Sequence, residues 1–144
     1  MRHLIRKANF EDLDGILKLL EQLSQQEGLV PRGKLEEVFD SILKNDDYYL
    51  NVCGTDNKLS GTSMLFIQHN LSHCGRSIGH IENVVVDEDY RGQGISKLLE
   101  MDLLMVAKQR GCYKTVLNCK EKNVPVYASV GFNRTGEIEM RVDF

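Results

Sequence analysis

The spacing of apolar residues along this 144-residue chain changes several times, and each change marks a predicted element. Leucine and isoleucine recur every three or four positions over residues 13–23, and apolar residues repeat with the same period over residues 35–43, as in amphipathic helices. A longer helix of the same pattern is predicted from Ile95 to Gly111, where glycine can take the left-handed conformation that closes a helix. A short fourth helix is predicted over residues 123–130.

Other segments are predicted to be β-strands, because they alternate apolar and polar residues or are rich in β-branched side chains. Residues 48–54 and 59–68 are separated by a turn rich in Asp and Asn, which predicts a hairpin. The predicted strands are residues 4–7, 48–54, 59–68, 80–87, 114–119 and 138–144. With the helices they give the order β-α-α-β-β-β-α-β-α-β, a mixed α/β arrangement expected to form one domain over residues 1–144.

Composition narrows the classes of function. Hydrophobic residues make up 42% of the chain, enough for a sizeable core, and the formal net charge of −3 disfavours a general nucleic-acid-binding protein. No apolar run reaches the length of a membrane span, and the first residues, MRHLIRKANF, lack the apolar region of a signal peptide. We therefore expect a cytoplasmic protein with neither a membrane span nor a nucleic-acid partner.

The spacing of the cysteines favours free thiols. Cys53, Cys74, Cys112 and Cys119 include no CxxC pair, so we expect no metal site and a reducing compartment. Cys119 follows a predicted strand, and no histidine lies near it in the sequence. We interpret it as a core thiol rather than a covalent nucleophile.

The segment over residues 79–99 combines a strand, a glycine-rich turn and the start of the long helix. Its β-branched residues suit a buried strand, which the polar residues after Asp87 bring to an end. Arg91, Gly92, Gln93 and Gly94 then lead into the helix. The first N–H groups of a helix lack internal partners and attract anions, glycines let a ligand approach the backbone closely, and arginine adds a charged donor. The context is typical of a phosphate-binding site, whereas Arg-Gly-x-Gly alone also suits a plain surface turn.

Two stretches of the chain resemble one enzyme family. GHIENVVVDEDYRGQGISKLL from Gly79, followed by GCYKTVLNCKEKNVPVYASVGF from Gly111, is similar to the GNAT acetyltransferase superfamily and, within it, to the glucosamine-6-phosphate N-acetyltransferases. The resemblance covers residues 79–132. It implies the GNAT fold, in which a mixed central sheet flanked by helices opens beside its central strand and the acyl-CoA lies in the gap.

The resemblance implies a set of residues that would bind acetyl-CoA. Backbone groups of the central strand would pair with the pantetheine arm and stabilise the developing oxyanion, and the glycine-rich loop would hold the pyrophosphate. A serine stands at position 96, where the family usually has glycine, and it adds a hydroxyl near the phosphates. The implied cofactor-binding residues are Val84, Val85, Val86, Arg91, Gly92, Gln93, Gly94, Ile95, Ser96, Asn123 and Tyr127.

Catalytic roles are implied for Tyr127, Glu82 and Asn118. The Tyr127 hydroxyl would serve the departing thiolate, although the residue alone also suits a packed aromatic. Glu82 is an acid among apolar strand residues, so we expect either a functional carboxylate, which would accept the proton of the amine, or an acid on a solvated strand face. Asn83 and Asn118 stand where the family usually or often has aspartate, and asparagine cannot act as a carboxylate base.

The implied substrate is a sugar phosphate, whose phosphate needs cationic partners. The family gathers these from the irregular segment before the central strand and from a partner subunit, although a lone loop histidine or arginine is more often solvated. The terminal residues 138–144 alternate and leave a strand edge uncovered, which together with the resemblance implies a homodimer with a shared site; a monomer's last strand is the alternative. The implied substrate-binding residues are Ser24, Asn70, His73, Glu82, Asn83, Asn118 and Arg141.

These inferences lead us to expect an enzyme that transfers acetyl directly from acetyl-CoA to the amine of glucosamine 6-phosphate, a step toward UDP-GlcNAc, with no acyl-enzyme and no metal. Two alternatives remain open. Asn83 and Asn118 are compatible with a GNAT enzyme that acts on another small amine or a peptide. A non-catalytic acyl-CoA-binding sensor is the alternative from another class, and the presence of Glu82 and Tyr127 argues against it.

Overall fold

The computed structural model describes residues 3–24, 31–55 and 57–144 and contains a five-stranded sheet with the order β1-β2-β3-β4-β5. Neighbouring strands are antiparallel except β4 and β5, which are parallel. The strands are β1 Ile5–Lys7, β2 Tyr48–Thr55, β3 Lys58–Gln68, β4 Ile78–Val86 and β5 Lys114–Val116. The predicted hairpin and central strand are confirmed, whereas β5 is shorter than the strand predicted over residues 114–119.

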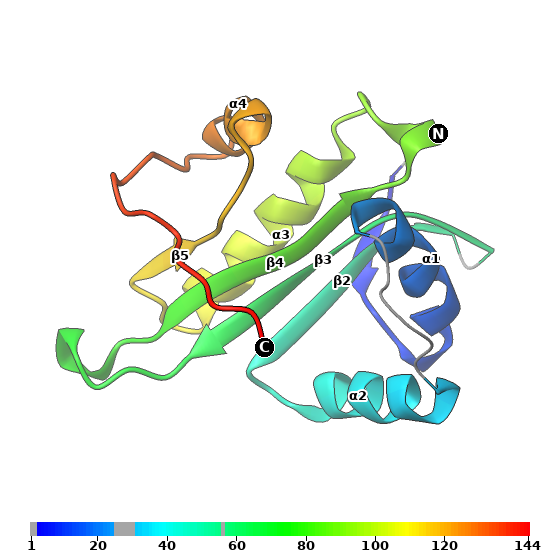
Figure 1. The fold of residues 1–144 in the computed structure, drawn as a ribbon, viewed down its shortest axis with the longest axis horizontal. Coiled ribbons are helices and arrows are strands. Elements are labelled where there is room, and N and C mark those ends of the chain that lie inside the picture. Colours follow the sequence, from blue (N-terminus) through cyan, green and yellow to red (C-terminus); the bar gives the residue numbers. More distant parts are fainter. Residues whose placement is uncertain (1–2, 25–30, 56) are drawn as a thin grey trace.

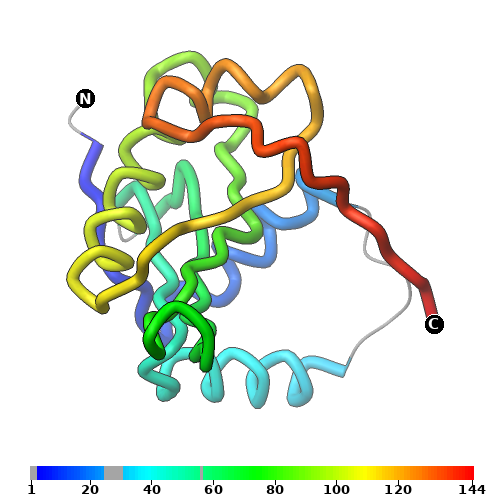
Figure 2. The backbone as a smooth tube through the Cα atoms, turned by 90° about the vertical axis from the view of Figure 1, so that its left-hand side faces the viewer, coloured from blue at the N-terminus to red at the C-terminus, as the bar shows by residue number. Residues whose placement is uncertain are grey.

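Helices cover both faces of the sheet (Figure 1). The helix α3, Ile95–Gln109, packs on β2, β3 and β4 from one side, and α1, Leu13–Leu23, packs on β3 and β4 from the other. The helix α2, Arg32–Lys44, contacts β2, and the short α4, Val124–Ala128, contacts α3. Seen from the side, the sheet lies between α3 and α1 (Figure 2). The predicted mixed α/β architecture is therefore confirmed.

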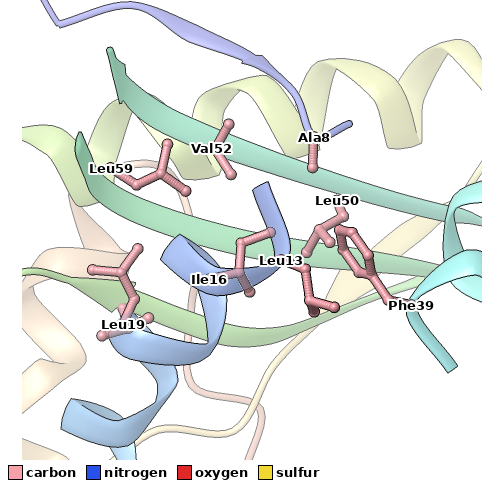
Figure 3. Close-up of a cluster of buried hydrophobic side chains, with 9 residues drawn as sticks. Ala8, Leu13, Ile16, Leu19, Phe39, Leu50, Val52 and Leu59 are labelled. Atoms are coloured by element: carbon pink, nitrogen blue, oxygen red, sulfur yellow. The ribbon is translucent and has the colours of Figure 1, made fainter. Parts of the chain in front are cut away.

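The core beneath α1 and α2 shows why these helices form where their apolar stripes predict. Leu13, Ile16 and Leu19 project from one side of α1 and are 2–6% exposed. Fully burying one such side chain contributes roughly 1.5–3 kcal/mol, so α1 is held to the sheet mainly by this stripe. The cluster consists of Ala8, Leu13, Ile16, Leu19, Phe39, Leu50, Val52, Leu59 and Val85, most of which are labelled in Figure 3.

On the opposite face, a buried polar network fixes the position of α3. Asn51 of β2 is fully buried, and its side-chain amide donates to the carbonyl oxygen of Leu99 at 3.1 Å and to Oδ2 of Asp102 at 2.8 Å. The Tyr49 hydroxyl donates to the same Asp102 oxygen at 2.9 Å. Buried polar groups are costly without partners, so these bonds specify how α3 is rotated and where its first turn points.

The central strand β4 carries a β-bulge at Asn83, whose φ is +55°. Met64 of β3 lies opposite Glu82 and Thr62 lies opposite Val85, so β4 has one residue more than β3 between these pairs. An extra residue reverses the faces that the following side chains take, and Val85 therefore points into the core beneath α1. Asparagine tolerates a positive φ better than the β-branched residues that follow it.

The terminal strand predicted over residues 138–144 was wrong for the single chain. The segment forms no strand, and in Figure 2 it leads away from the other elements to the C-terminus. Its apolar side chains, Ile138, Met140, Val142 and Phe144, are 85%, 90%, 73% and 115% exposed. A strand exists through hydrogen bonds to a neighbouring strand, and among the described residues no strand of the sheet pairs with this segment.

Two predicted irregular segments flank these elements. The loop predicted over residues 24–33 lies largely outside the described residues, as does residue 56 of the hairpin turn. The segment before β4 is irregular as expected, and it includes a tight turn at His73–Gly75 whose residues have positive φ values. In the part of the chain that the structure describes, no helix is both long and apolar enough to cross a membrane.

Candidate active site

A cleft opens where β4 and β5 separate. The two strands pair at three positions, the last being His80 opposite Val116, after which β5 ends and β4 continues to Val86. The cleft has a volume of about 1050 Å³. Its walls are the second half of β4, the first turn of α3, the segment after β5, and α4, with the end of α1 and Glu139 of the terminal segment also in contact with it. A smaller cavity of about 480 Å³ lies elsewhere, near Tyr49 and Arg110, and its lining includes none of the predicted site residues.

The glycine-rich loop forms one end of the cleft and leads directly into α3. Gly92 and Gly94 have φ values of +78° and +79°, which residues with a side chain rarely adopt. Gly94 precedes the first turn of α3, whose N–H groups have no acceptors within the helix. Arg91 is anchored by a hydrogen bond from Nε to the carbonyl oxygen of Val86 at 3.2 Å. The loop therefore presents backbone donors, the positive end of the helix dipole and a guanidinium group.

The far half of β4 offers backbone groups rather than side chains. Val84, Val85 and Val86 line the cleft, although the side chain of Val85 is 5% exposed and packs in the core. Because β5 stops opposite His80, no described strand covers the edge of β4 beyond that residue. An extended ligand with amide groups can hydrogen-bond to such an edge as a neighbouring strand would. This geometry fits the predicted role of the three valines.

Tyr127 of α4 lines the opposite wall of the cleft. Its ring packs edge-on against Phe132, with centroids 6.1 Å apart and planes at 82°. Burial raises the pKa of the Tyr127 hydroxyl to about 12, and the nearby Glu100 and Cys119 add to the rise. The hydroxyl therefore stays protonated near neutral pH, and the residue is at once a packed aromatic and a possible proton donor.

Glu82, Asn83 and Asn118 all line the cleft, and all three are exposed. Glu82 is exposed, so of its two interpretations the acid on a solvated strand face describes its surroundings. An exposed carboxylate at the mouth of the cleft can still meet an amine from solution. Asn118 follows β5, on the wall across from β4.

Predicted cofactor residues that line the cleft are Val84, Val85, Val86, Arg91, Gly92, Gly94, Ile95, Ser96, Asn123 and Tyr127. Gln93 is absent from the lining, and its Oε1 instead hydrogen-bonds with Nε2 of His3 at 3.0 Å. The interpretation of Cys119 as a core thiol was wrong. It is exposed and lines the cleft, because β5 ends at Val116 and leaves the following residues outside the sheet.

The other predicted substrate residues lie outside the cleft of this single chain. Ser24, His73 and Arg141 are exposed and Asn70 is half-buried, and none of the four is among the described residues that line it. The ring of His73 stacks on that of Tyr113, with centroids 4.2 Å apart. The roles assigned to these residues stay predictions.

Glu100 of α3 is a residue of this region that the sequence analysis missed. It is 0% exposed, and its Oε1 accepts a hydrogen bond from Oγ of Ser96 at 2.6 Å. Burial raises the pKa of Glu100 to about 6, although the bond from Ser96 opposes the shift. A signal was present in the sequence, since Ser96, Glu100, Leu103 and Ala107 recur at helical spacing and the last two are apolar.

The sequence is similar to proteins of known activity. Residues 15–132 match the model of the acetyltransferase (GNAT) family. The glucosamine 6-phosphate N-acetyltransferase of Trypanosoma brucei brucei is 45% identical over 86 residues, which are 60% of this chain and 58% of that protein. Glucosamine 6-phosphate N-acetyltransferase 1 of Dictyostelium discoideum is 33% identical over 136 residues, covering 91% of this chain and 85% of that protein.

The fold is also found among solved structures. The crystal structure of glucosamine-6-phosphate N-acetyltransferase from Arabidopsis thaliana matches with a TM-score of 0.91 and 29% sequence identity, covering 100% of this chain and 99% of that chain. The family model spans most of the present sequence, and it includes the strand, loop and helix that bound the cleft. The chain therefore belongs to the acetyltransferase (GNAT) family.

Proposed function

We propose that this protein transfers the acetyl group of acetyl-CoA to the amine of D-glucosamine 6-phosphate, giving N-acetylglucosamine 6-phosphate and free coenzyme A. The observation that carries the proposal is the cleft between β4 and β5, with the glycine-rich loop at one end and Tyr127 in its wall. Named glucosamine 6-phosphate N-acetyltransferases that match this chain over most of its length support the choice of acceptor.

The chemistry of the cleft walls fits coenzyme A. Positive φ values at Gly92 and Gly94 let the loop turn its N–H groups outward, and these groups and Arg91 suit a pyrophosphate. The open edge of β4 suits the amide groups of the pantetheine arm. A cleft of about 1050 Å³ has room for an extended ligand and a sugar.

The reaction requires two proton transfers that residues of the cleft can perform. Acetyl-CoA supplies an acetyl thioester, whose C–S bond breaks as the amide C–N bond forms. Glu82 is proposed to accept the first proton of the ammonium group, directly or through water, since only the neutral amine has a free electron pair. Tyr127 is proposed to donate its hydroxyl proton to the leaving sulfur, and the second proton of the amine then replaces it. A backbone N–H within residues 84–86 is proposed to stabilise the charge on the acetyl oxygen.

The remaining predicted residues are proposed to bind the sugar phosphate. Asn83 and Asn118 lie in the cleft and can hydrogen-bond sugar hydroxyls through their amides. Arg141 is proposed to reach the phosphate from a second copy of the chain in a homodimer, because it lies outside the cleft of its own chain. Ser24, Asn70 and His73 are proposed to complete this part of the site.

The organisation and location of the protein are also proposals. We propose one domain over residues 1–144, because helices on both faces pack against one sheet. The four cysteines, Cys53, Cys74, Cys112 and Cys119, are free thiols, which supports a reducing compartment such as the cytoplasm.

A panel of amines tests the function. Purified protein is incubated with acetyl-CoA and glucosamine 6-phosphate, glucosamine, small polyamines or peptides, and release of the free thiol is followed. The proposal predicts the highest kcat/KM for glucosamine 6-phosphate and a large loss when the phosphate is removed. Preference for another amine would identify a different acetyltransferase, and tight coenzyme binding with no turnover would identify a sensor.

The Glu82→Gln variant tests the proposed base in the same assay. The amide cannot accept a proton, so kcat/KM should fall by about 10²-fold or more. Glu88→Gln is a matched control, because Glu88 is exposed and lies outside the cleft lining. Equal activity of the two variants would remove Glu82 from the mechanism.

A further inference from the structure

The pair formed by Ser96 and Glu100 lies at the end of the cleft proposed for the pyrophosphate. Ser96 is half-buried in the first turn of α3 and lines the cleft, and Glu100 lies one turn further along the same helix. The Ser96 hydroxyl donates to Oε1 of Glu100 at 2.6 Å. A residue at the cofactor loop is thus tied to a carboxyl group that is itself 0% exposed.

Glu100 is incompletely satisfied in this position. Its second oxygen, Oε2, is buried and has no hydrogen-bond partner among the described residues. A buried carboxylate that receives a single hydrogen bond is an unfavourable anion, and an unpaired buried oxygen calls for a functional explanation. Burial raises the pKa of Glu100 to about 6, so its proton can be exchanged close to neutral pH.

Few titratable groups on the elements packed around α3 interact with the carboxyl of Glu100. Besides burial, Glu100 and Cys119 both raise the pKa of Tyr127 of α4 through charge repulsion. Other titratable groups on the sheet have partners of their own or lie in solvent. Hydrogen bonds join Tyr49 to Asp102, His80 to Gln68 and Arg6 to Asp12, and Lys58 lies over the ring of Tyr90. Lys7 and Glu82 are exposed, and Cys53 packs against Ile95 and Leu99. Burial and Ser96 therefore determine the protonation of Glu100.

The two protonation states of Glu100 have opposite effects on Ser96. A carboxylate only accepts hydrogen bonds, so the ionised form occupies the single hydrogen of the Ser96 hydroxyl. A protonated carboxyl can donate to Oγ of Ser96, which leaves the serine hydrogen free for another acceptor. A phosphate oxygen is an acceptor and never a donor when ionised, so it pairs with Ser96 in the second state.

We propose that Glu100 is a positioning residue for the coenzyme, which takes up a proton from solvent when coenzyme A binds and so frees the Ser96 hydroxyl to donate to the pyrophosphate. This inference rests on the proposed coenzyme site. Protonation also removes a negative charge from beneath the phosphates and from the surroundings of Tyr127. The same event therefore favours coenzyme binding and makes the Tyr127 hydroxyl a stronger acid toward the leaving thiolate.

Calorimetry measures the proton directly. Coenzyme A is titrated into the wild type and Glu100→Gln at about pH 6.5 in buffers of different ionisation enthalpy, which gives the protons taken up per coenzyme bound. If coenzyme A binds the protein with protonated Glu100 about tenfold more tightly than the protein with ionised Glu100, the wild type should take up about half a proton more per coenzyme than Glu100→Gln. Protonation of the coenzyme's own phosphates contributes equally to both proteins and cancels in the difference. Glu36 of α2 has a side chain that is 49% exposed, and the control variant Glu36→Gln should keep the wild-type proton uptake.

The pH dependence of affinity and a second variant complete the test. From about pH 8 to about pH 5.5, coenzyme affinity should rise about five- to tenfold more in the wild type than in Glu100→Gln, whose amide already donates to Ser96. Ser96→Ala keeps the buried carboxyl but removes the hydroxyl, so it should lose most of the extra uptake. The half-buried position 96 tolerates alanine, which keeps the test available even if Glu100→Gln folds poorly.

Each outcome has one meaning. Equal proton uptake in the wild type and Glu100→Gln overturns the inference. Full uptake in Ser96→Ala also overturns it, because charge repulsion alone would then explain the linkage. If coenzyme A binds the wild type at no pH, the proposed function fails, and the inference fails with it.

Discussion

Glu100 and Tyr127 lie on facing elements of the cleft, and burial raises the pKa of each. The physical cause is shared, because the charged form of either group would lose its hydration in this position. Ionisation of Glu100 further raises the pKa of Tyr127, so the two groups cannot both be charged without cost. Near neutral pH a neutral tyrosine therefore lines the cleft, and the buried carboxyl that influences its pKa is close to its own titration point.

The buried carboxyl makes the stability of the fold depend on pH. The pKa of Glu100 is about 6 in the folded protein and 4.5 in its ordinary state, so folding favours the protonated form. Its contribution is fully present below about pH 4.5 and is lost as the pH rises through about 6, a change of about 2 kcal/mol. Glu100→Gln should therefore gain about 2 kcal/mol of unfolding free energy relative to the wild type between about pH 4.5 and about pH 8.

Urea unfolding at several pH values measures this difference. Taking the difference between the variant and the wild type cancels the other titrating groups of the chain. Parallel stability curves for the two proteins would show that Glu100 is not destabilised by ionisation.

Tyr127→Phe tests the proton donor. The substitution removes the hydroxyl and keeps the aromatic ring that packs on Phe132, so the fold and substrate binding should be retained. Because the proton is transferred in the transition state, kcat should fall by about 10²-fold while the KM values change little. Steady-state kinetics at varied acetyl-CoA and amine concentrations separates the two, and an unchanged kcat would exclude the role.

At the scale of elements, the start of α3 and the divergence of β4 from β5 create the cleft together. The buried network of Asn51 and Asp102 fixes α3 on the sheet, and the bulge at Asn83 turns the following part of β4. The early end of β5 then leaves that part of β4 uncovered. The loop before α3 closes one end of the space, and its path depends on two glycines with positive φ.

Gly94→Val tests that path. The φ of +79° costs a β-branched residue about 1–2 kcal/mol, so the loop should shift and coenzyme A affinity should fall about tenfold. Gly111→Val is a matched control at the other end of α3, where φ is +78° and a side chain would likewise meet nothing within 4 Å. Both variants should lose similar stability in chemical unfolding, and only Gly94→Val should lose coenzyme affinity by calorimetry. Equal affinity in both would remove the loop from the site.

At the scale of the whole molecule, the segment 138–144 exposes apolar side chains that the rest of the described chain does not cover. Its residues alternate as in a strand, yet its apolar side chains are exposed and it pairs with no described strand of its own chain. Pairing with a second copy would bury these side chains and satisfy the backbone. The same pairing would explain why Arg141, a predicted phosphate ligand, lies outside the cleft of its own chain.

Light scattering tests the proposed homodimer. The full chain should have twice the mass of one protomer, and a variant that lacks residues 138–144 should be monomeric with a much weaker affinity for the sugar phosphate. Arg141→Ala should remain dimeric and lose about tenfold in sugar-phosphate affinity, whereas Arg134→Ala, whose side chain pairs with Glu121, should keep it. A monomeric wild type at assay concentration would exclude the shared site.

The sequence by itself determined the elements that depend on local spacing. The apolar stripe of α1, the hairpin of β2 and β3, and the strand, loop and helix from residue 79 onward all appear where the pattern places them. Local signals suffice there, because helix and strand periods decide which side chains can be buried together. The resemblance carried by residues 79–132 likewise gave the family that the comparisons confirm.

Tertiary structure decided whatever depends on neighbours that are distant in the sequence. The exposure of Glu82 and Cys119 follows from how β4 and β5 pack, and composition or period does not reveal it. The helical period places Glu100 in line with apolar residues of α3, but the packing of α3 on the sheet decides that it is buried. The terminal segment has the pattern of a strand and forms none, because a strand requires a partner with free hydrogen-bonding groups. A side-chain pattern states what a segment can bury, whereas the fold decides whether anything is there to cover it.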